Sequence, residues 1–257
     1  MNPSAFDPRT HQPAAAELAG RIIAITGASA GIGRAVALEC ARHGATVILI
    51  GRDERRLSDA HADIEAACGR TDSTLVQLDL ENALAGDYDA LAHAIHERFG
   101  RLDGLLHNAG LLGRLAPVEY YDVPTWCRVL QVNLTAAFAL TQVLLPLLKL
   151  SADAAVVFTG SSVGRVGRPN WGAYAVSKAG IENLVQVLAA ELAGITRVRV
   201  NAINPGPVRT QMRRQAYPAE DAAALPLPES LTAPYLALLG PASRGVTGGS
   251  FDAQPVR

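Results

Sequence analysis

The amino-acid sequence predicts an α/β fold in which a doubly wound parallel sheet carries helices on both faces. Short apolar runs rich in β-branched residues alternate with longer helical segments along the 257 residues. The runs are apolar throughout, which is typical of strands buried on both sides. Because crossovers between parallel strands are right-handed, this alternation predicts one Rossmann-like domain.

The first half of the chain supplies four predicted strands separated by three predicted helices. The strands are expected at residues 21–26, 46–50, 73–78 and 103–107, and the helices at 32–43, 54–67 and 85–99. Gly44 and Gly69 follow the first two helices, where glycine readily adopts the left-handed conformation that ends a helix. Asp53 stands where its carboxylate can cap the second helix.

The second half continues the alternation with longer helices. Strands are expected at 154–158, 197–203 and near 250–251, and helices at 123–149, 172–193 and near 231–239. Pro146 lies inside the first of these helices. Because the residue before a proline disfavours the helical conformation, we expect that helix to bend or split near Leu145.

The chain is expected to consist of a short tail and one domain. Residues 1–14 are polar, proline-rich and unpatterned, so they predict a flexible N-terminal tail. No repeat or linker divides residues 15–257. We therefore predict that this range folds as a single unit.

Composition excludes several classes of protein. The net charge of −1 gives no basic excess for nucleic acid or anionic lipid, and 49% hydrophobic residues suffice for a core. The three cysteines, Cys40, Cys68 and Cys127, have the spacing of neither a disulfide framework nor a metal site. The apolar run 144–150 is too short to span a bilayer, and no leader is apparent. We expect a cytoplasmic protein with no metal and no membrane partner.

A glycine-rich turn joins the first strand to the first helix. Gly27, Gly31 and Gly33 stand where a backbone can approach a pyrophosphate closely, with the helix N-terminus directed at it. The spacing is G-x-x-x-G-x-G, and a lone glycine run of this kind can also be a plain tight turn. Its place between a strand and a helix favours a dinucleotide site.

Arg52, at the end of the second strand, indicates which of the two nicotinamide dinucleotides, NAD(H) or NADP(H), the chain binds. An acidic residue there would bind a ribose 2′-hydroxyl, whereas arginine matches a 2′-phosphate. We therefore predict NADP(H), with NAD(H) the less favoured form. Ala30 stands where a second basic residue would strengthen the preference, and a solvated loop charge is the alternative role for Arg52.

Tyr174 and Lys178 lie four residues apart on a predicted helix, so both side chains are on one face. An ammonium group near a phenol favours the phenolate and makes the phenol more acidic. Beside a nicotinamide, such a phenol could transfer a proton.

Taken in order, the motifs resemble those of the short-chain dehydrogenase/reductase family, most closely its bacterial YciK-like oxidoreductase subgroup. They cover residues 20–210, and the subgroup likeness rests on 158–171 and on the ending 251–255. The matching motifs are Thr26-Gly-Ala-Ser-Ala-Gly-Ile-Gly33, Asp79-Leu80, Asn108-Ala-Gly110, Asn133, Ser161, Tyr174-x-x-x-Lys178 and Pro205-Gly206-x-x-x-Thr210.

The resemblance implies a catalytic set of Asn133, Ser161, Tyr174 and Lys178. Tyr174 would be the acid/base, and Lys178, with an oxidised nicotinamide, would lower its pKa. Ser161 would bind the substrate oxygen; it lies thirteen residues before Tyr174, the family's spacing, which selects it over Ser162. Asn133 would hold a water that links Lys178 to solvent.

The resemblance also implies which residues contact the cofactor, apart from Tyr174 and Lys178, which would reach the nicotinamide ribose. They are Gly27, Ser29, Ala30, Gly31, Ile32, Gly33, Arg52, Asp79, Leu80, Asn108, Ala109, Gly110, Pro205, Gly206, Val208 and Thr210. Most stand where strands end, which is where open α/β sheets bind ligands. His107 departs from the family's usual asparagine and is interpreted as a strand-end residue without a catalytic role.

The substrate is expected to be a small carbonyl compound or alcohol, covered by a loop at about 211–229. Five arginines flank the site and either bind an anionic group of the substrate, are solvated or make subunit contacts: Arg165, Arg168, Arg209, Arg213 and Arg214. Trp171 is expected either to floor the pocket or to pack in the core.

Three functions fit these features. The first is an NADP(H)-dependent reductase or alcohol dehydrogenase in a dinucleotide-binding oxidoreductase domain. The second is a dinucleotide-binding regulator or scaffold with little turnover, which would have no need for the Tyr174–Lys178 pair. The third keeps the site but epimerises its substrate through a transient ketone. The resemblance implies a homodimer or homotetramer that pairs through the helices at 123–149 and 172–193.

Overall fold

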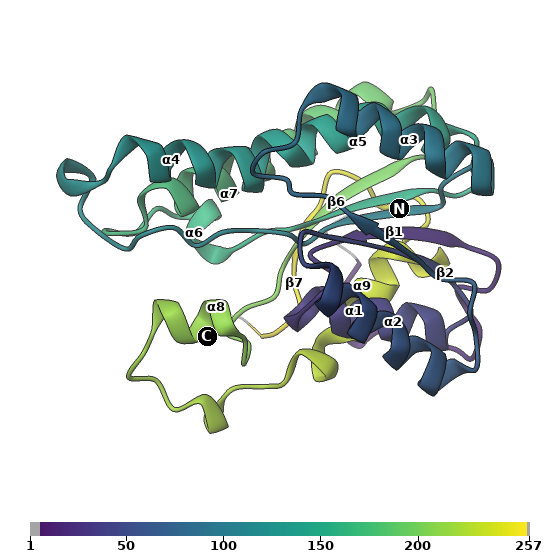
Figure 1. Ribbon diagram of the computed structural model, residues 1–257, viewed down its shortest axis with the longest axis horizontal. Helices are drawn as coiled ribbons and strands as arrows, with labels where there is room; N and C mark the ends of the chain where they lie inside the picture. The colour runs from purple at the N-terminus through teal and green to yellow at the C-terminus, as the bar shows by residue number, and fades with distance from the viewer. Residues whose placement is uncertain (1–5, 256–257) are drawn as a thin grey trace.

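The computed structural model describes residues 6–255 and contains a seven-stranded parallel sheet between two layers of helices (Figure 1). The strands are β1 (Ile22–Thr26), β2 (Thr46–Gly51), β3 (Thr74–Gln77), β4 (Gly104–His107), β5 (Ala155–Thr159), β6 (Arg199–Asn204) and β7 (Ser250–Asp252). Their order is β3-β2-β1-β4-β5-β6-β7, which confirms the doubly wound α/β prediction.

The two helical layers bury opposite faces of the sheet. One layer holds α3 (Ala85–Phe99), α5 (Ala136–Lys149) and α7 (Gly172–Leu192), and the other holds α1 (Gly31–Arg42), α2 (Glu54–Cys68) and α9 (Thr232–Leu239) (Figure 1). β1, β4 and β5 are buried along their whole length because both of their faces pack on helices. This explains why their sequences are continuously apolar rather than alternating.

The sheet reverses its winding between β1 and β4. The chain starts at β1, moves outward to β2 and β3, and then returns to place β4 on the other side of β1. Crevices beyond the carboxyl ends of strands open at such a switch point. The glycine turn after β1 and the Asn108–Gly110 segment after β4 therefore meet at one crevice.

The long helical stretch is interrupted at a different place from the one predicted. It consists of α4 (Val123–Leu130), a π-helical turn (Gln131–Thr135) and α5, and α5 continues through Pro146. A π turn inserts one extra residue into a helix and often marks a functional site. By length and composition this run could cross a bilayer, but its apolar face, including Leu140, Leu144 and Leu148, belongs to the main core.

Part of the segment expected to be a flexible tail packs against the body. The Phe6 ring meets the Phe251 ring edge-on at 5.6 Å, and Pro8 is buried at the start of a short 3₁₀ helix (Pro8–Thr10). Apolar contacts with β7 and α9 thus hold this part of the segment. The described part of this segment therefore has contacts with the folded body at Phe6 and Pro8, and the first five residues lie outside the described range.

Candidate active site

The glycine turn after β1 is shaped by contact with the segment after β4. A Cβ atom on Gly27, whose φ is +67°, would lie 2.9 Å from the Ala109 Cα, and a Cβ on Gly33 would overlap the Gly27 carbonyl oxygen. Ala30 occupies the N-cap of α1 without a side-chain acceptor, so the first amides of α1 stay available to an anion. These features fit a pyrophosphate.

Thr26 links the two segments that border this crevice, the turn after β1 and the segment after β4. Its hydroxyl oxygen accepts hydrogen bonds from the backbone amides of Asn108 and Ala109 at 3.0 and 3.1 Å. The side chain of a buried strand residue thus sets the path of the segment after β4. Thr26 begins the glycine motif, but its sequence position alone did not reveal this role.

The remaining segments predicted to bind the cofactor come to the same edge of the sheet. Gly31 faces Thr210, with 3.5 Å between its virtual Cβ and the Thr210 methyl group, so the glycine turn meets the segment after β6. The Gln254 amide donates to the carbonyl oxygens of Pro205 and Pro207 at 2.7 and 2.8 Å, which shapes the loop around Gly206. Val208 and Leu80 are buried, whereas Ser29, Ile32 and Gly110 are half-buried.

Arg52 lies at the end of β2 with 65% of its side chain exposed. Its guanidinium is 3.9 Å from the Glu81 carboxylate, and its backbone carbonyl accepts from the Gln77 amide. Asp79 accepts from the amide of Glu81 and from Asn82, and so orders the turn after β3. The guanidinium, whose one ionic partner among residues 6–255 is Glu81, is exposed beside the carboxyl ends of β2 and β3, where a ligand could reach it.

Tyr174 and Lys178 share one face of α7, as predicted. The Lys178 ammonium lies 5.7 Å from the centre of the Tyr174 ring and donates a 2.7 Å hydrogen bond to the Thr159 carbonyl at the end of β5. Ser161 occupies the N-cap position of the short helix α6 (Ser162–Arg165) that follows β5, and its side chain lies close enough to the Tyr174 hydroxyl to affect the pKa of that group. The predicted phenol, ammonium and serine are therefore neighbours.

The pKa values of this pair differ from the expectation of an acidified phenol. Burial raises the pKa of Tyr174, and the neighbouring Ser161 side chain offsets this only in part. Burial also lowers the pKa of Lys178 to about 8, against an opposing effect of the Glu182 charge. The cause is the low exposure of both side chains, 9% for Tyr174 and 5% for Lys178, which disfavours their charged forms.

Asn133 lies in the π turn and is 2% exposed. Its amide oxygen accepts from the Leu111 backbone amide at 2.7 Å, while its nitrogen donates to the Leu111 carbonyl at 2.9 Å and the Ser177 hydroxyl at 3.0 Å. The extra residue of the π turn thus directs this side chain inward and fastens it to α7. Ser177, inside the Tyr174–Lys178 spacer, is a contact that the sequence did not reveal.

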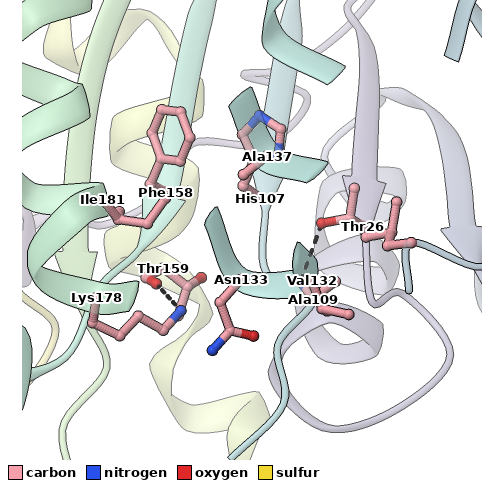
Figure 2. A pocket seen from close by; sticks show the side chains of 11 residues that line it. Thr26, His107, Ala109, Val132, Asn133, Ala137, Phe158, Thr159, Lys178 and Ile181 are labelled. Carbon is pink, nitrogen blue, oxygen red and sulfur yellow. Dashed lines mark hydrogen bonds between the residues drawn. The ribbon is translucent and has the colours of Figure 1, made fainter. Parts of the chain in front are cut away.

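A small cavity lies between Asn133, Lys178 and Thr159, with room for the centre of about one water molecule (Figure 2). His107 and Phe158 close its inner end. The His107 ring stacks on Phe158 at 4.6 Å and pairs with the Thr141 hydroxyl, and burial lowers its pKa to about 3. His107 is therefore a neutral wall of the cavity, in accord with its interpretation as a strand-end residue.

Apolar side chains form a small cluster around Tyr174. The Trp171 ring lies 5.7 Å from the Tyr174 ring and 6.0 Å from the Tyr217 ring, so it covers the phenol rather than the main core. The cluster also contains Leu112, Leu115, Val163, Ala175, Met212 and Ala216, the last two from helix α8 (Gln211–Ala216).

Three of the five flanking arginines are engaged elsewhere. Arg165 binds the Asp252 carboxylate, Arg213 forms 2.6 Å hydrogen bonds with Glu220, and Arg209 donates to backbone carbonyls of its own loop. Within residues 6–255, the guanidinium groups of Arg168 and Arg214 form no hydrogen bond or ion pair and are exposed.

Among residues 6–255, no group of three histidine, cysteine or acidic side chains is placed to hold a metal ion, and the three cysteines are free thiols. The crevice itself presents a phenol, an ammonium, a hydroxyl and a glycine-rich turn.

The chain is similar to known short-chain dehydrogenases over most of its length. The sequence model described as short chain dehydrogenase matches residues 21–221. The uncharacterized oxidoreductase YciK of Escherichia coli K12 is 49% identical over 96% of this chain and 97% of its own length. A short-chain dehydrogenase structure from E. coli CFT073 in complex with NADPH superposes with a TM-score of 0.92, at 50% identity over 95% of this chain and 100% of that one. One from Shigella flexneri 2a in complex with NADP has a TM-score of 0.91, at 48% identity over 94% and 100%.

Proposed function

Because the chain belongs to the short-chain dehydrogenase/reductase family, we propose that it is an NADP(H)-dependent oxidoreductase acting on a carbonyl compound or the corresponding alcohol. The observation that carries this proposal is the grouping of Tyr174, Ser161 and Lys178 beside the glycine-lined crevice. When bound, the nicotinamide supplies or accepts the hydride. The residues of the chain bind and orient the cofactor and the substrate, and they exchange the proton.

Each catalytic side chain has a separate task in this proposal. Tyr174 gives its hydroxyl proton to the substrate oxygen during reduction and takes a proton back during oxidation. Ser161 donates to the same oxygen and stabilises its developing charge. Lys178 is the nearby cation that favours the ionised phenol. Asn133 borders the cavity in which a water would pass protons between Lys178 and solvent.

A cofactor-preference measurement tests the role of Arg52. The Arg52→Ala variant should bind NADPH about 10–100-fold more weakly, because a charge-assisted bond to the 2′-phosphate is lost, and NADH about as well as the wild type does. Fluorescence titration with both nucleotides measures this. Arg56→Ala, a neighbouring exposed arginine on α2, is the matched control. A wild type that prefers NADH would contradict the NADP(H) assignment.

The surroundings of Tyr174 favour a neutral substrate over an anionic one. Apolar side chains flank the phenol, and three of the nearby arginines already have partners. Burying an unpaired carboxylate there would be costly. We therefore assign the substrate to the class of neutral, partly apolar ketones and aldehydes.

A matched pair of ketones tests both the activity and the substrate class. The wild type should oxidise NADPH with ethyl acetoacetate, and kcat/KM should be at least about tenfold higher than with the acetoacetate anion. The Arg168→Ala/Arg214→Ala variant should keep this ratio within about twofold. A ratio that favours acetoacetate and depends on these arginines would support the anionic alternative. Binding of NADPH without turnover of any ketone, aldehyde or quinone would support the scaffold.

An apolar surface on α5 and α7 supports a homo-oligomer. Phe138 and Val187 are about half exposed, and with Leu134, Gly180 and Leu184 they border one groove. We propose a homodimer or homotetramer that buries this surface, located in the cytoplasm. Light scattering at micromolar concentration should therefore give a dimer or tetramer mass, and Phe138→Glu should shift it toward the monomer. A monomeric wild type would exclude this arrangement.

A further inference from the structure

A third ionisable residue continues the catalytic face of α7. Tyr174, Lys178 and Glu182 are each four residues apart, so they lie one above another on the helix. The Glu182 side chain is 12% exposed. Its Oε1 atom is buried and has no hydrogen-bond partner within residues 6–255; the nearest guanidinium nitrogen, Arg165 Nε, is 3.6 Å away.

Lys178 and Glu182 approach consecutive residues at the end of β5. The Lys178 ammonium donates to the Thr159 carbonyl at 2.7 Å. A Cβ atom on the next residue, Gly160, would lie 2.8 Å from the Glu182 Oε1. The ammonium and the carboxylate therefore share one small region of the structure, and the absence of a side chain at position 160 leaves space for the carboxylate.

Arg165, which forms a 3.6 Å ion pair with the Glu182 carboxylate, is itself bonded to β7 at the edge of the sheet. Its guanidinium donates to both Asp252 carboxylate oxygens at 2.9 Å and to the Phe251 carbonyl at 2.7 Å. The Asn204 amide donates to Asp252 at 2.8 Å. Glu182 thus faces a cation tied to β6 and β7, next to the loop expected to bind the nicotinamide.

We propose that Glu182 is a positioning residue for Lys178. Its buried carboxylate keeps the Lys178 ammonium charged and directed at the region between Thr159 and Tyr174, while Arg165 keeps the carboxylate in place. The catalytic consequence rests on the proposed oxidoreductase function. The electrostatic effect on Lys178 does not, and can be measured without any substrate.

The other ionisable groups in this part of the structure do not supply this negative charge. Burial keeps His107 of β4 neutral near pH 7, and it raises the pKa values of Tyr174 on α7 and Tyr235 on α9, so both phenols are protonated there. On β7, Asp252 is neutralised by its two bonds to Arg165 of α6. Glu182 is therefore the anion available to offset the burial of the ammonium.

The chain contains two lysines, Lys149 and Lys178, which allows a direct test. In protein carrying isotope-labelled lysine, the Cε resonance of Lys178 should titrate with a midpoint of about 8. In Glu182→Gln the midpoint should fall by about one pH unit, since a nearby negative charge is lost. In Glu182→Asp the fall should be smaller. Lys149→Arg assigns the two resonances.

Glu191→Gln is the matched control, because Glu191 is an exposed glutamate on the same helix. It should leave the Lys178 midpoint unchanged. An equal midpoint in wild type and Glu182→Gln would overturn the proposal. So would an equal fall in both glutamine variants.

The pH profile of catalysis gives a second readout. For reduction of ethyl acetoacetate, the loss of kcat at high pH should move to lower pH in Glu182→Gln by the same amount as the lysine midpoint. The KM for NADPH should stay within about twofold. A purely structural role would lower kcat equally at every pH, and that result would overturn the proposal. A wild type without any turnover would refute the oxidoreductase function but leave the lysine titration decisive for Glu182.

Discussion

Replacing Tyr174 by phenylalanine should lower kcat for carbonyl reduction by about 10²–10⁴-fold, the range typical for loss of a general acid. The substitution removes one hydroxyl and keeps the ring that packs between Trp171 and Lys178. The affinity for NADPH should therefore change by less than about threefold. Steady-state kinetics and fluorescence titration measure the two quantities.

A second buried tyrosine provides the control for this experiment. Tyr88 on α3 is 5% exposed and lies outside the crevice, so Tyr88→Phe should keep kcat within about twofold. If Tyr174→Phe behaved like Tyr88→Phe, another group would have to supply the proton. The assignment of the phenol as acid/base would then be wrong.

Replacing Lys178 by methionine should abolish activity and stabilise the protein at the same time. Activity should fall by at least about 10²-fold, because the cation that favours the ionised phenol is lost. Stability should rise because the ammonium is buried, and its pKa falls from 10.5 in water to about 8 in the folded chain. Methionine fills similar space without a charge.

The pH dependence of unfolding shows whether the buried Lys178 charge stabilises or destabilises the folded chain. Between about pH 8 and pH 10.5 the unfolded chain binds more protons at Lys178 than the folded chain, so wild-type stability should rise with pH in this window. Below this pH window, burial of the charged ammonium lowers the free energy of unfolding by up to about 3 kcal/mol. The Lys178→Met variant should regain this amount at neutral pH. Urea unfolding at several pH values measures both, with the exposed Lys149→Met as control. A less stable Lys178→Met would contradict the account.

The layers of the fold were predictable because buried strands and helices differ in period and length. The interruption of the helix at 131–135 was not, because Gln131-Val-Asn-Leu-Thr135 continues a helical pattern without a break. Its cause is a contact distant in sequence, the pairing of Asn133 with Leu111. Pro146, the local signal, sits within α5 without ending it.

The site residues were selected by spacing, but their electrostatics were not predictable. The expected lowering of the Tyr174 pKa followed from the charges of Lys178 and an oxidised nicotinamide, whereas burial of the side chain raises it. Likewise, the partners of Arg165 and Arg213 lie on segments whose approach no local pattern predicts. Glu182 had one usable signal: it lies one turn beyond Lys178, which makes it a neighbour of that side chain.

Transfer of deuterium from NADPH labelled at the reactive nicotinamide carbon is the measurement that tests the central claim most directly. The protein carrying one equivalent of this nucleotide is mixed with ethyl acetoacetate, and the alcohol product is analysed by mass spectrometry. We expect the wild type to form alcohol with one deuterium at the former carbonyl carbon, and Tyr174→Phe to form it at least about 100-fold more slowly. Bound nucleotide with no labelled alcohol from the wild type, or equal rates in both proteins, would contradict the account.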